Sequence, residues 1–95
     1  MESKGREVYF VFMNFDPEYE RLQKNRSKQG GHELDLYLST KHDLLLNKLL
    51  QPNTYKKMYS LAIVDGFAVQ MTKDQAAILQ GAKEVRIVEK NQELA

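Results

Sequence analysis

The chain has no cysteine and no tryptophan, and it has only two histidines in 95 residues. Without cysteine, disulfides, zinc–thiolate centres and thiol nucleophiles are excluded. His32 and His42 have no carboxylates at a ligand-like spacing, so the sequence predicts no metal and no other cofactor. No apolar run approaches the roughly 20 residues that cross a bilayer. The polar start MESKGRE also lacks the apolar core of a signal peptide, so we expect no membrane partner.

No charge of one sign dominates. The chain contains fourteen Lys and Arg residues and thirteen Asp and Glu residues, which gives a net charge of +1, and the two signs are interspersed along the sequence. Nucleic-acid-binding domains usually carry a concentrated basic surface, so we expect no nucleic-acid partner. Ser39 and Ser60 lack a sequence context typical of a nucleophile, so the sequence predicts no enzyme.

Four short stretches rich in β-branched and aromatic residues predict strands. The first, EVYFVFMNF, is apolar on both faces and is too short for a helix. Asp65-Gly66 is a turn signal that joins the second and third stretches into a hairpin. The predicted strands cover residues 7–15, 54–64, 67–71 and 84–91.

Two helices are predicted between these strands. Apolar residues at three- and four-residue spacing predict a helix over residues 33–50, which Pro52 prevents from continuing. Thr72 is a typical N-cap and Gly81 a typical terminator, so a second helix should span residues 73–80. The charged segment 16–31 ends in a glycine pair and predicts a surface loop with about one helical turn.

The order β-α-β-β-α-β predicts an α+β fold of the ferredoxin-like type, a four-stranded antiparallel sheet with two helices on one face. We expect a single domain over residues 1–95, with a folded core over 7–91 and a tail over 92–95. The other sheet face would be bare. Residues of the first strand are apolar on both sides, so an apolar set must lie on that face. Such a face indicates a recognition surface, unless the 16–31 loop or a second copy covers it.

Five segments together resemble a known family. VYFVFM, KHDLLLNKLL, YKKMYS, DGFAVQMTKDQAAIL and EVRIVEKN are similar, in order and spacing, to the prodomain (inhibitor propeptide) of subtilisin-like serine proteases, particularly the plant type. The sequence departs from the plant pattern at Asp65, where asparagine is usual, and at Ala82-Lys83-Glu84, which replaces a Pro-Gly pair.

This resemblance implies a protein without catalytic residues of its own. Such prodomains lay the open sheet face on two helices of the protease, assist its folding, and pass their C-terminal tail through the substrate cleft as an inhibitor. The implied partner is the catalytic domain of a subtilisin-like serine protease, in the secretory pathway or outside the cell. A stand-alone inhibitor of the same type is an alternative.

Strand alternation separates the predicted contact residues from the core. Phe67, Val69 and Met71 should lie under the helices. Ala68 and Gln70 lie on the opposite side and, with Tyr59 of the second strand, are the predicted protease contacts. Ordinary core packing is the alternative for Tyr59.

Asp65 is expected at the edge of this surface. The resemblance implies that its carboxylate caps the N-termini of the protease helices, where backbone N–H groups and the helix dipole attract an anion. Alternatively, Asp65 only forms the turn with Gly66.

The C-terminal tail is the predicted cleft-binding segment. Gln92, Glu93, Leu94 and Ala95 would occupy substrate subsites by strand pairing, or else form a frayed terminus. His42 is expected to be a packed helix residue. Titration of His42 or His32 offers a hypothesis for pH-dependent release.

Two other classes share the predicted fold. RNA-recognition modules have the same element order and a Gly-Phe-Ala-like motif, but here Asp65 replaces a basic residue and Val69 replaces a stacking aromatic. An acylphosphatase-type enzyme needs a phosphate-binding loop after the first strand, where NFDPEYER is acidic. Both alternatives are weaker than the protease-binding interpretation.

Overall fold

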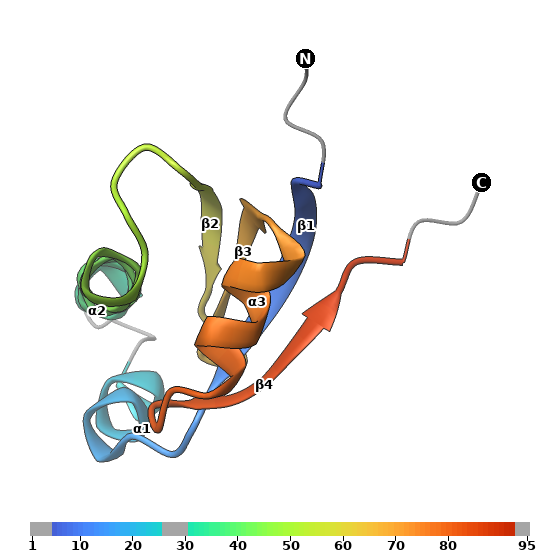
Figure 1. Ribbon diagram of the computed structural model, residues 1–95. Helices are drawn as coiled ribbons and strands as arrows, with labels where there is room; N and C mark the ends of the chain where they lie inside the picture. Colours follow the sequence, from blue (N-terminus) through green and yellow to red (C-terminus); the bar gives the residue numbers. More distant parts are fainter. Residues whose placement is uncertain (1–4, 26–30, 93–95) are drawn as a thin grey trace.

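The computed structural model describes residues 5–25 and 31–92, which contain one antiparallel sheet and three helices (Figure 1). The strands lie in the order β2-β3-β1-β4. In chain order, the elements are β1 (Glu7–Met13), α1 (Pro17–Lys24), α2 (Gly31–Leu49), β2 (Lys56–Leu61), β3 (Gly66–Met71), α3 (Lys73–Gln80) and β4 (Val85–Lys90). This arrangement confirms the ferredoxin-like α+β prediction. None of the described helices is long and apolar enough to cross a membrane.

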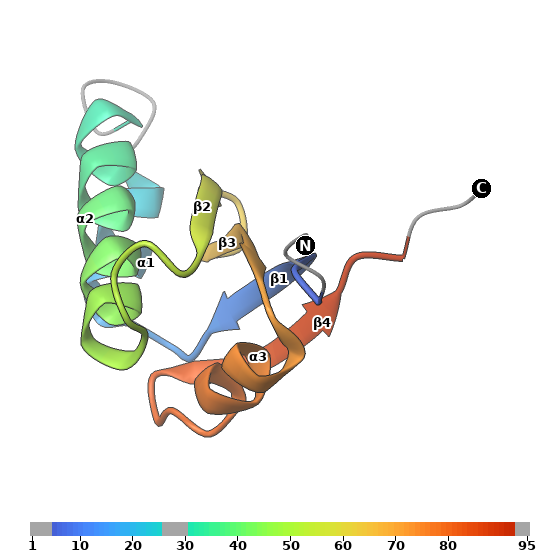
Figure 2. The same cartoon turned by 45° about the horizontal axis from the view of Figure 1, so that its top comes forward.

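The main core lies between the sheet and the helices α2 and α3 (Figures 1 and 2). Alternate residues of β1 and β3 point into it, and both helices contribute to the same cluster, so they cover the same sheet face. As predicted, Phe67, Val69 and Met71 are fully buried there. The other core members are Tyr9, Val11, Met13, Leu45, Leu46, Leu50, Ala76, Leu79 and Val85.

The prediction of a surface loop over residues 16–31 was wrong in part, because residues 17–24 form the two-turn helix α1. Asp16 is its N-cap: the Asp16 side chain accepts a hydrogen bond from the Glu18 backbone N–H at 3.0 Å. Pro17 stands in the first turn, and the acidic start and basic end of the helix both suit its dipole.

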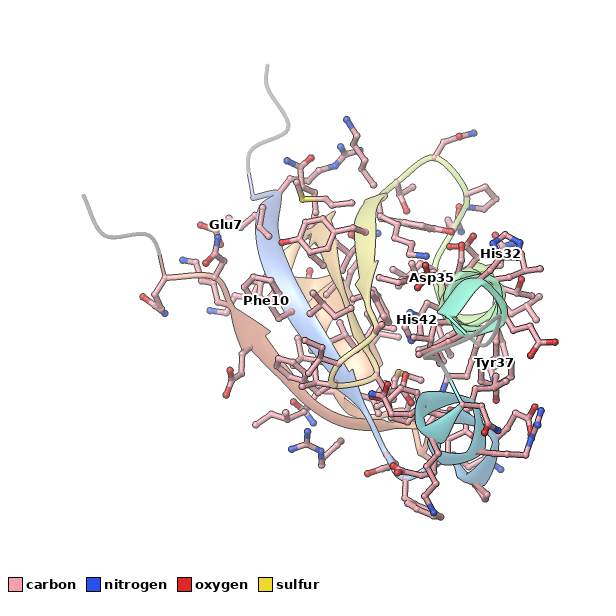
Figure 3. The ribbon with its side chains drawn as sticks, turned by 180° about the vertical axis from the view of Figure 1, so that it is seen from behind. Glu7, Phe10, His32, Asp35, Tyr37 and His42 are labelled. Carbon is pink, nitrogen blue, oxygen red and sulfur yellow. The ribbon has the colours of Figure 1, made fainter. Side chains whose placement is uncertain are left out.

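The helix α1 supports the β2–β3 turn rather than covering the sheet. Tyr19 and Leu22 are buried in a second, smaller cluster with Leu34 and Leu38 of α2, and Ala62 of the turn packs against this cluster. The described part of the 16–31 segment therefore leaves the second sheet face bare. Figure 3, drawn from behind, shows Phe10 over the strands with no helix in front of it.

Gly66 begins β3 at a point where β1 leaves no space for a side chain. A Cβ atom at this position would lie 2.7 Å from the Val11 carbonyl oxygen and 3.0 Å from Cδ1 of Phe12. Glycine therefore allows the Phe12 ring to lie against the backbone of β3.

We predict that Gly66→Ala destabilises the domain by about 1–3 kcal/mol, because the backbone contact can be relieved only by moving β1 or β3. The free energy of unfolding in urea measures this loss. Gly81→Ala is the matched control, since a Cβ at Gly81 meets only ordinary contacts at 3.7 and 3.8 Å and its φ of −84° suits alanine. The account of Gly66 is contradicted if both variants have the stability of the wild type.

Candidate protein-docking surface

The strand register defines the uncovered sheet face, which we call the open face. Tyr59, Ala68, Phe10 and Glu89 form one cross-strand row, and Leu61, Gly66, Phe12 and Ile87 form the next. A shorter row contains Lys56, Gln70 and Val8. The first two rows place Ala68 and Gly66, small residues of β3, between large apolar residues of its two neighbours, β1 and β2.

The predicted contact residues differ in their exposure. The Tyr59 side chain is 49% exposed, and Gln70, Phe10 and Phe12 are partly buried. Ala68 lies on the open face as predicted, but it is 0% exposed between its register neighbours Phe10 and Tyr59. Ala68 is therefore covered by these rings, and its role as a protease contact stays a prediction.

Asp65 is buried, which contradicts its expected place on the surface. Its exposure is 4%, and its φ of 47° lies in the left-handed region that aspartate tolerates better than most residues. One carboxylate oxygen accepts a hydrogen bond from Lys41 Nζ at 2.7 Å, and the other lies 3.0 Å from His42 Nε2. Both oxygens are thus engaged within the chain, so Asp65 is a poor cap for a partner's helix.

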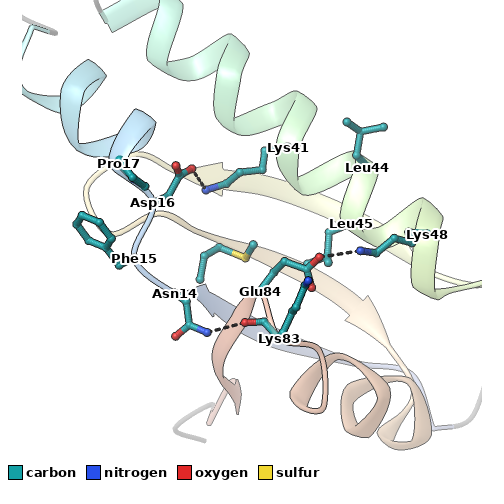
Figure 4. A pocket seen from close by; sticks show the side chains of 11 residues that line it. Asn14, Phe15, Asp16, Pro17, Lys41, Leu44, Leu45, Lys48, Lys83 and Glu84 are labelled. Atoms are coloured by element: carbon teal, nitrogen blue, oxygen red, sulfur yellow. Dashed lines mark hydrogen bonds and ion pairs between the residues drawn. The ribbon is translucent and has the colours of Figure 1, made fainter.

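Lys41 joins Asp65 to the start of α1. Its Nζ atom also donates to Asp16 Oδ2 at 2.8 Å (Figure 4), and the Tyr37 hydroxyl donates to the same oxygen at 2.6 Å. Burial raises the pKa of Asp16, but these hydrogen bonds and the Lys41 charge outweigh it and hold the pKa below its usual value. One ammonium group therefore bridges two carboxylates from distant parts of the sequence.

His42 is a packed helix residue, as predicted. Its side chain is 0% exposed and its ring lies 4.7 Å from the Phe67 ring. Because Nε2 faces the Asp65 carboxylate, this nitrogen carries the proton, and Nδ1 accepts a hydrogen bond from Ser60 Oγ at 2.9 Å. Burial lowers the pKa of His42, and the positive charges of Lys41 and Lys57 lower it further. The hydrogen bond and negative charge of Asp65 raise it by less, so the ring is neutral near pH 7.

Ser60, His42 and Asp65 are the residue types of a hydrolase triad, and no local sequence pattern indicates that they meet. Their geometry does not suit catalysis. A triad histidine must pass the serine proton to the leaving group of a bound substrate, whereas the His42 ring is 0% exposed and no substrate can reach it. The array instead ties α2 to β2 and to the β2–β3 turn.

A pocket of about 490 Å³ lies between α2, the start of α1 and the segment before β4 (Figure 4). The start of α1, the outer part of α2 and the segment before β4 line it, including Phe15, Leu44 and Lys83. None of the predicted contact residues lines this pocket. Among the described residues, no group of three or more histidine or acidic side chains is placed to hold a metal.

The predicted cleft-binding tail is only partly described. Gln92 is exposed beyond the end of β4, where Asn91 N–H donates to the Val8 carbonyl oxygen at 2.9 Å. Glu93, Leu94 and Ala95 lie outside the described residues.

An uncovered apolar and aromatic sheet face on a small α+β domain indicates a recognition surface. Residues 16–95 match the profile of the peptidase inhibitor I9 family, and the chain belongs to this family. Its sequence is 39% identical over 101 aligned positions to subtilisin-like protease SBT2.5 of Arabidopsis thaliana, covering 90% of this chain and 12% of that protein. It is also 39% identical over 56 positions to subtilisin-like protease SBT2.6, covering 58% of this chain and 7% of that protein.

The resemblance to plant subtilisin-like protease prodomains is thus confirmed. The chain spans only a small part of the length of these two relatives. No solved structure matches the chain significantly.

We predict that Lys41→Met destabilises the domain by about 3 kcal/mol, because it leaves two poorly exposed carboxylates without their cation. Lys48→Met, on the same helix, should cost less than about 1 kcal/mol, since the Lys48–Glu84 pair is exposed, with side-chain exposures of 58% and 35%. Urea unfolding at pH 7 compares the two variants. Equal losses would mean that the buried pairs contribute no more than a surface pair.

We predict that acid destabilises the domain through His42. Because the pKa of His42 is lower in the folded state than the value of 6.5 usual for an exposed histidine, the unfolded chain binds more protons below about pH 6.5. The free energy of unfolding should therefore be constant above this pH and fall below it, by at most about 1.4 kcal/mol per pH unit. Below pH 3.8, protonation of Asp16 should lower it further.

Urea unfolding between pH 8 and pH 4.5 measures this dependence. His42→Gln should be less stable than the wild type at pH 8 but should lose most of the slope, whereas His32→Gln, at an exposed position of α2, should keep it. An unchanged slope in His42→Gln would assign the pH dependence to other groups.

Proposed function

We propose that this chain is the prodomain of a subtilisin-like serine protease, which assists the folding of the catalytic domain and then inhibits it reversibly. The open face carries the proposal. It presents Phe10, Phe12 and Tyr59 in adjacent rows, while every large core residue of β1 and β3 points to the helices. Membership of the peptidase inhibitor I9 family and the similarity to two plant proteases favour a subtilisin-like catalytic domain as the partner.

The physical basis of docking is burial of aromatic and aliphatic surface. Aromatic side chains are common at the energetic centres of interfaces, and the proposed centre is the Tyr59–Ala68–Phe10 row with Gln70 beside it. Ala68 acts here as the small residue between two rings. The guanidinium group of Arg86 lies 5.9 Å from the centre of the Phe12 ring, so a cation borders the apolar area and adds polar contacts at its rim.

The C-terminal tail is the proposed inhibitory segment. Residues 92–95 would pair as a strand with the substrate cleft of the catalytic domain, while the open face holds the domain in place. Because the partner binds only the folded form, docking stabilises a small domain whose own core is thin. The proposed location is the secretory pathway or the extracellular space.

A stand-alone protease inhibitor and an RNA-binding module are the two alternatives. A stand-alone inhibitor would use the same face and tail without ever having been covalently joined to its target. RNA binding is disfavoured because the net charge is only +1 and because Glu89, opposite Phe10, offsets the positive charges of Lys56 and Arg86 on and beside the open face. Membership of a peptidase inhibitor family also favours a protease partner.

We predict sub-micromolar inhibition when the 95-residue chain is added to purified catalytic domains of plant subtilisin-like proteases, SBT2.5 among them. Cleavage of a fluorogenic peptide gives the inhibition constant. A variant without residues 92–95 should bind within about tenfold of the full chain, by surface plasmon resonance, but should lose most of the inhibition. Absence of binding to every protease tested would contradict the proposal.

A further inference from the structure

The turn between β2 and β3 presents aliphatic side chains to solvent. Ile63 is 73% exposed and Val64 is 45% exposed, in a tight turn where polar residues and glycine are the usual choice. Neither side chain belongs to the two buried clusters. Folding of this chain therefore does not explain why β-branched residues stand there.

The backbone on both sides of these two residues is fixed by other elements. The Ala62 carbonyl oxygen accepts hydrogen bonds from the Tyr19 hydroxyl at 2.6 Å and from Gln23 Nε2 at 3.1 Å, both on α1. On the other side, the Asp65 carbonyl oxygen accepts from the Met13 N–H at 3.0 Å, and the Asp65 carboxylate is held by Lys41 and His42. The exposed aliphatic pair therefore stands on a rigid base.

Such a turn suits binding because little entropy is lost when a fixed segment is buried. The turn also continues the open face. Leu61 and Gly66, which close it, pair with each other and lie in one row with Phe12 and Ile87. The apolar surface of that row thus extends along the chain to Ile63 and Val64.

We propose that Ile63 and Val64 form an anchor that inserts into an apolar depression on the catalytic domain, beside the area covered by the open face. This inference rests on the proposed function. The anchor and the tail act at opposite ends of the domain: β1 runs from Glu7, which pairs with Lys90 at 3.1 Å near the tail, to Met13 beside the turn. A seven-residue strand separates these ends by about 20 Å. The anchor therefore sets affinity independently of cleft occupation.

The test measures dissociation constants of the 95-residue chain and its variants for the plant subtilisin-like catalytic domain that the wild type binds most tightly. We expect Ile63→Ser to raise the dissociation constant at least tenfold, mainly through faster dissociation. Ile78→Ser is the matched control, because Ile78 is an isoleucine of α3, 49% exposed on the helix side. It should change the constant less than threefold.

Removal of residues 92–95 provides a second comparison. If anchor and tail act separately, Ile63→Ser should weaken the truncated chain by the same factor as the full chain. Urea midpoints of all variants establish that the fold is kept. If the wild type binds and Ile63→Ser binds within threefold of it, the anchor is overturned while the open-face docking stands. If the wild type binds no protease, the anchor and the proposed function are both overturned.

Discussion

A single ammonium group, that of Lys41, holds together the part of the structure on which the rest depends. It lies 2.8 Å from Asp16 and 2.7 Å from Asp65, and so connects the start of α1, the middle of α2 and the β2–β3 turn. Asp65 also engages His42, whose ring reaches Ser60 on β2. Buried charges are costly unless they are paired and hydrogen-bonded. This network therefore tolerates few alternative arrangements of α1 and the turn.

The same network explains why one sheet face stays available for a partner. Because the β2–β3 turn is bound to α1 and α2, the small cluster around Tyr19 and Leu22 forms on the helix side of the sheet. The helix α1 therefore does not cover the open face. The large residues of β1 and β3 fill the main core. What remains on the open face is a set of rings and aliphatic groups that folding alone buries only in part. In the proposed complex, the protease surface would complete their burial.

The sequence predicted those features that depend on local patterns. Alternation in β3 separated the core set from the open face, whereas β1 is apolar on both sides and left its two faces unassigned. Thr72 with Gly81 correctly bounded α3. The helix α1 was missed because its charged composition suggested a loop, although Asp16-Pro17 followed by Glu18 is a usual helix start. The burial of Asp65 had no local signal, since its partner Lys41 is 24 residues away. The burial of Ala68 likewise depends on rings from two other strands.

The central claim is that the open face docks on a protease catalytic domain, and site-specific photo-crosslinking tests it most directly. A photoreactive phenylalanine placed at Tyr59, 49% exposed on the open face, is compared with one at Leu36, 61% exposed on α2. The account predicts a covalent product with the catalytic domain from position 59 and none from position 36. Crosslinking from position 36 alone would place the interface on the helices and contradict the account.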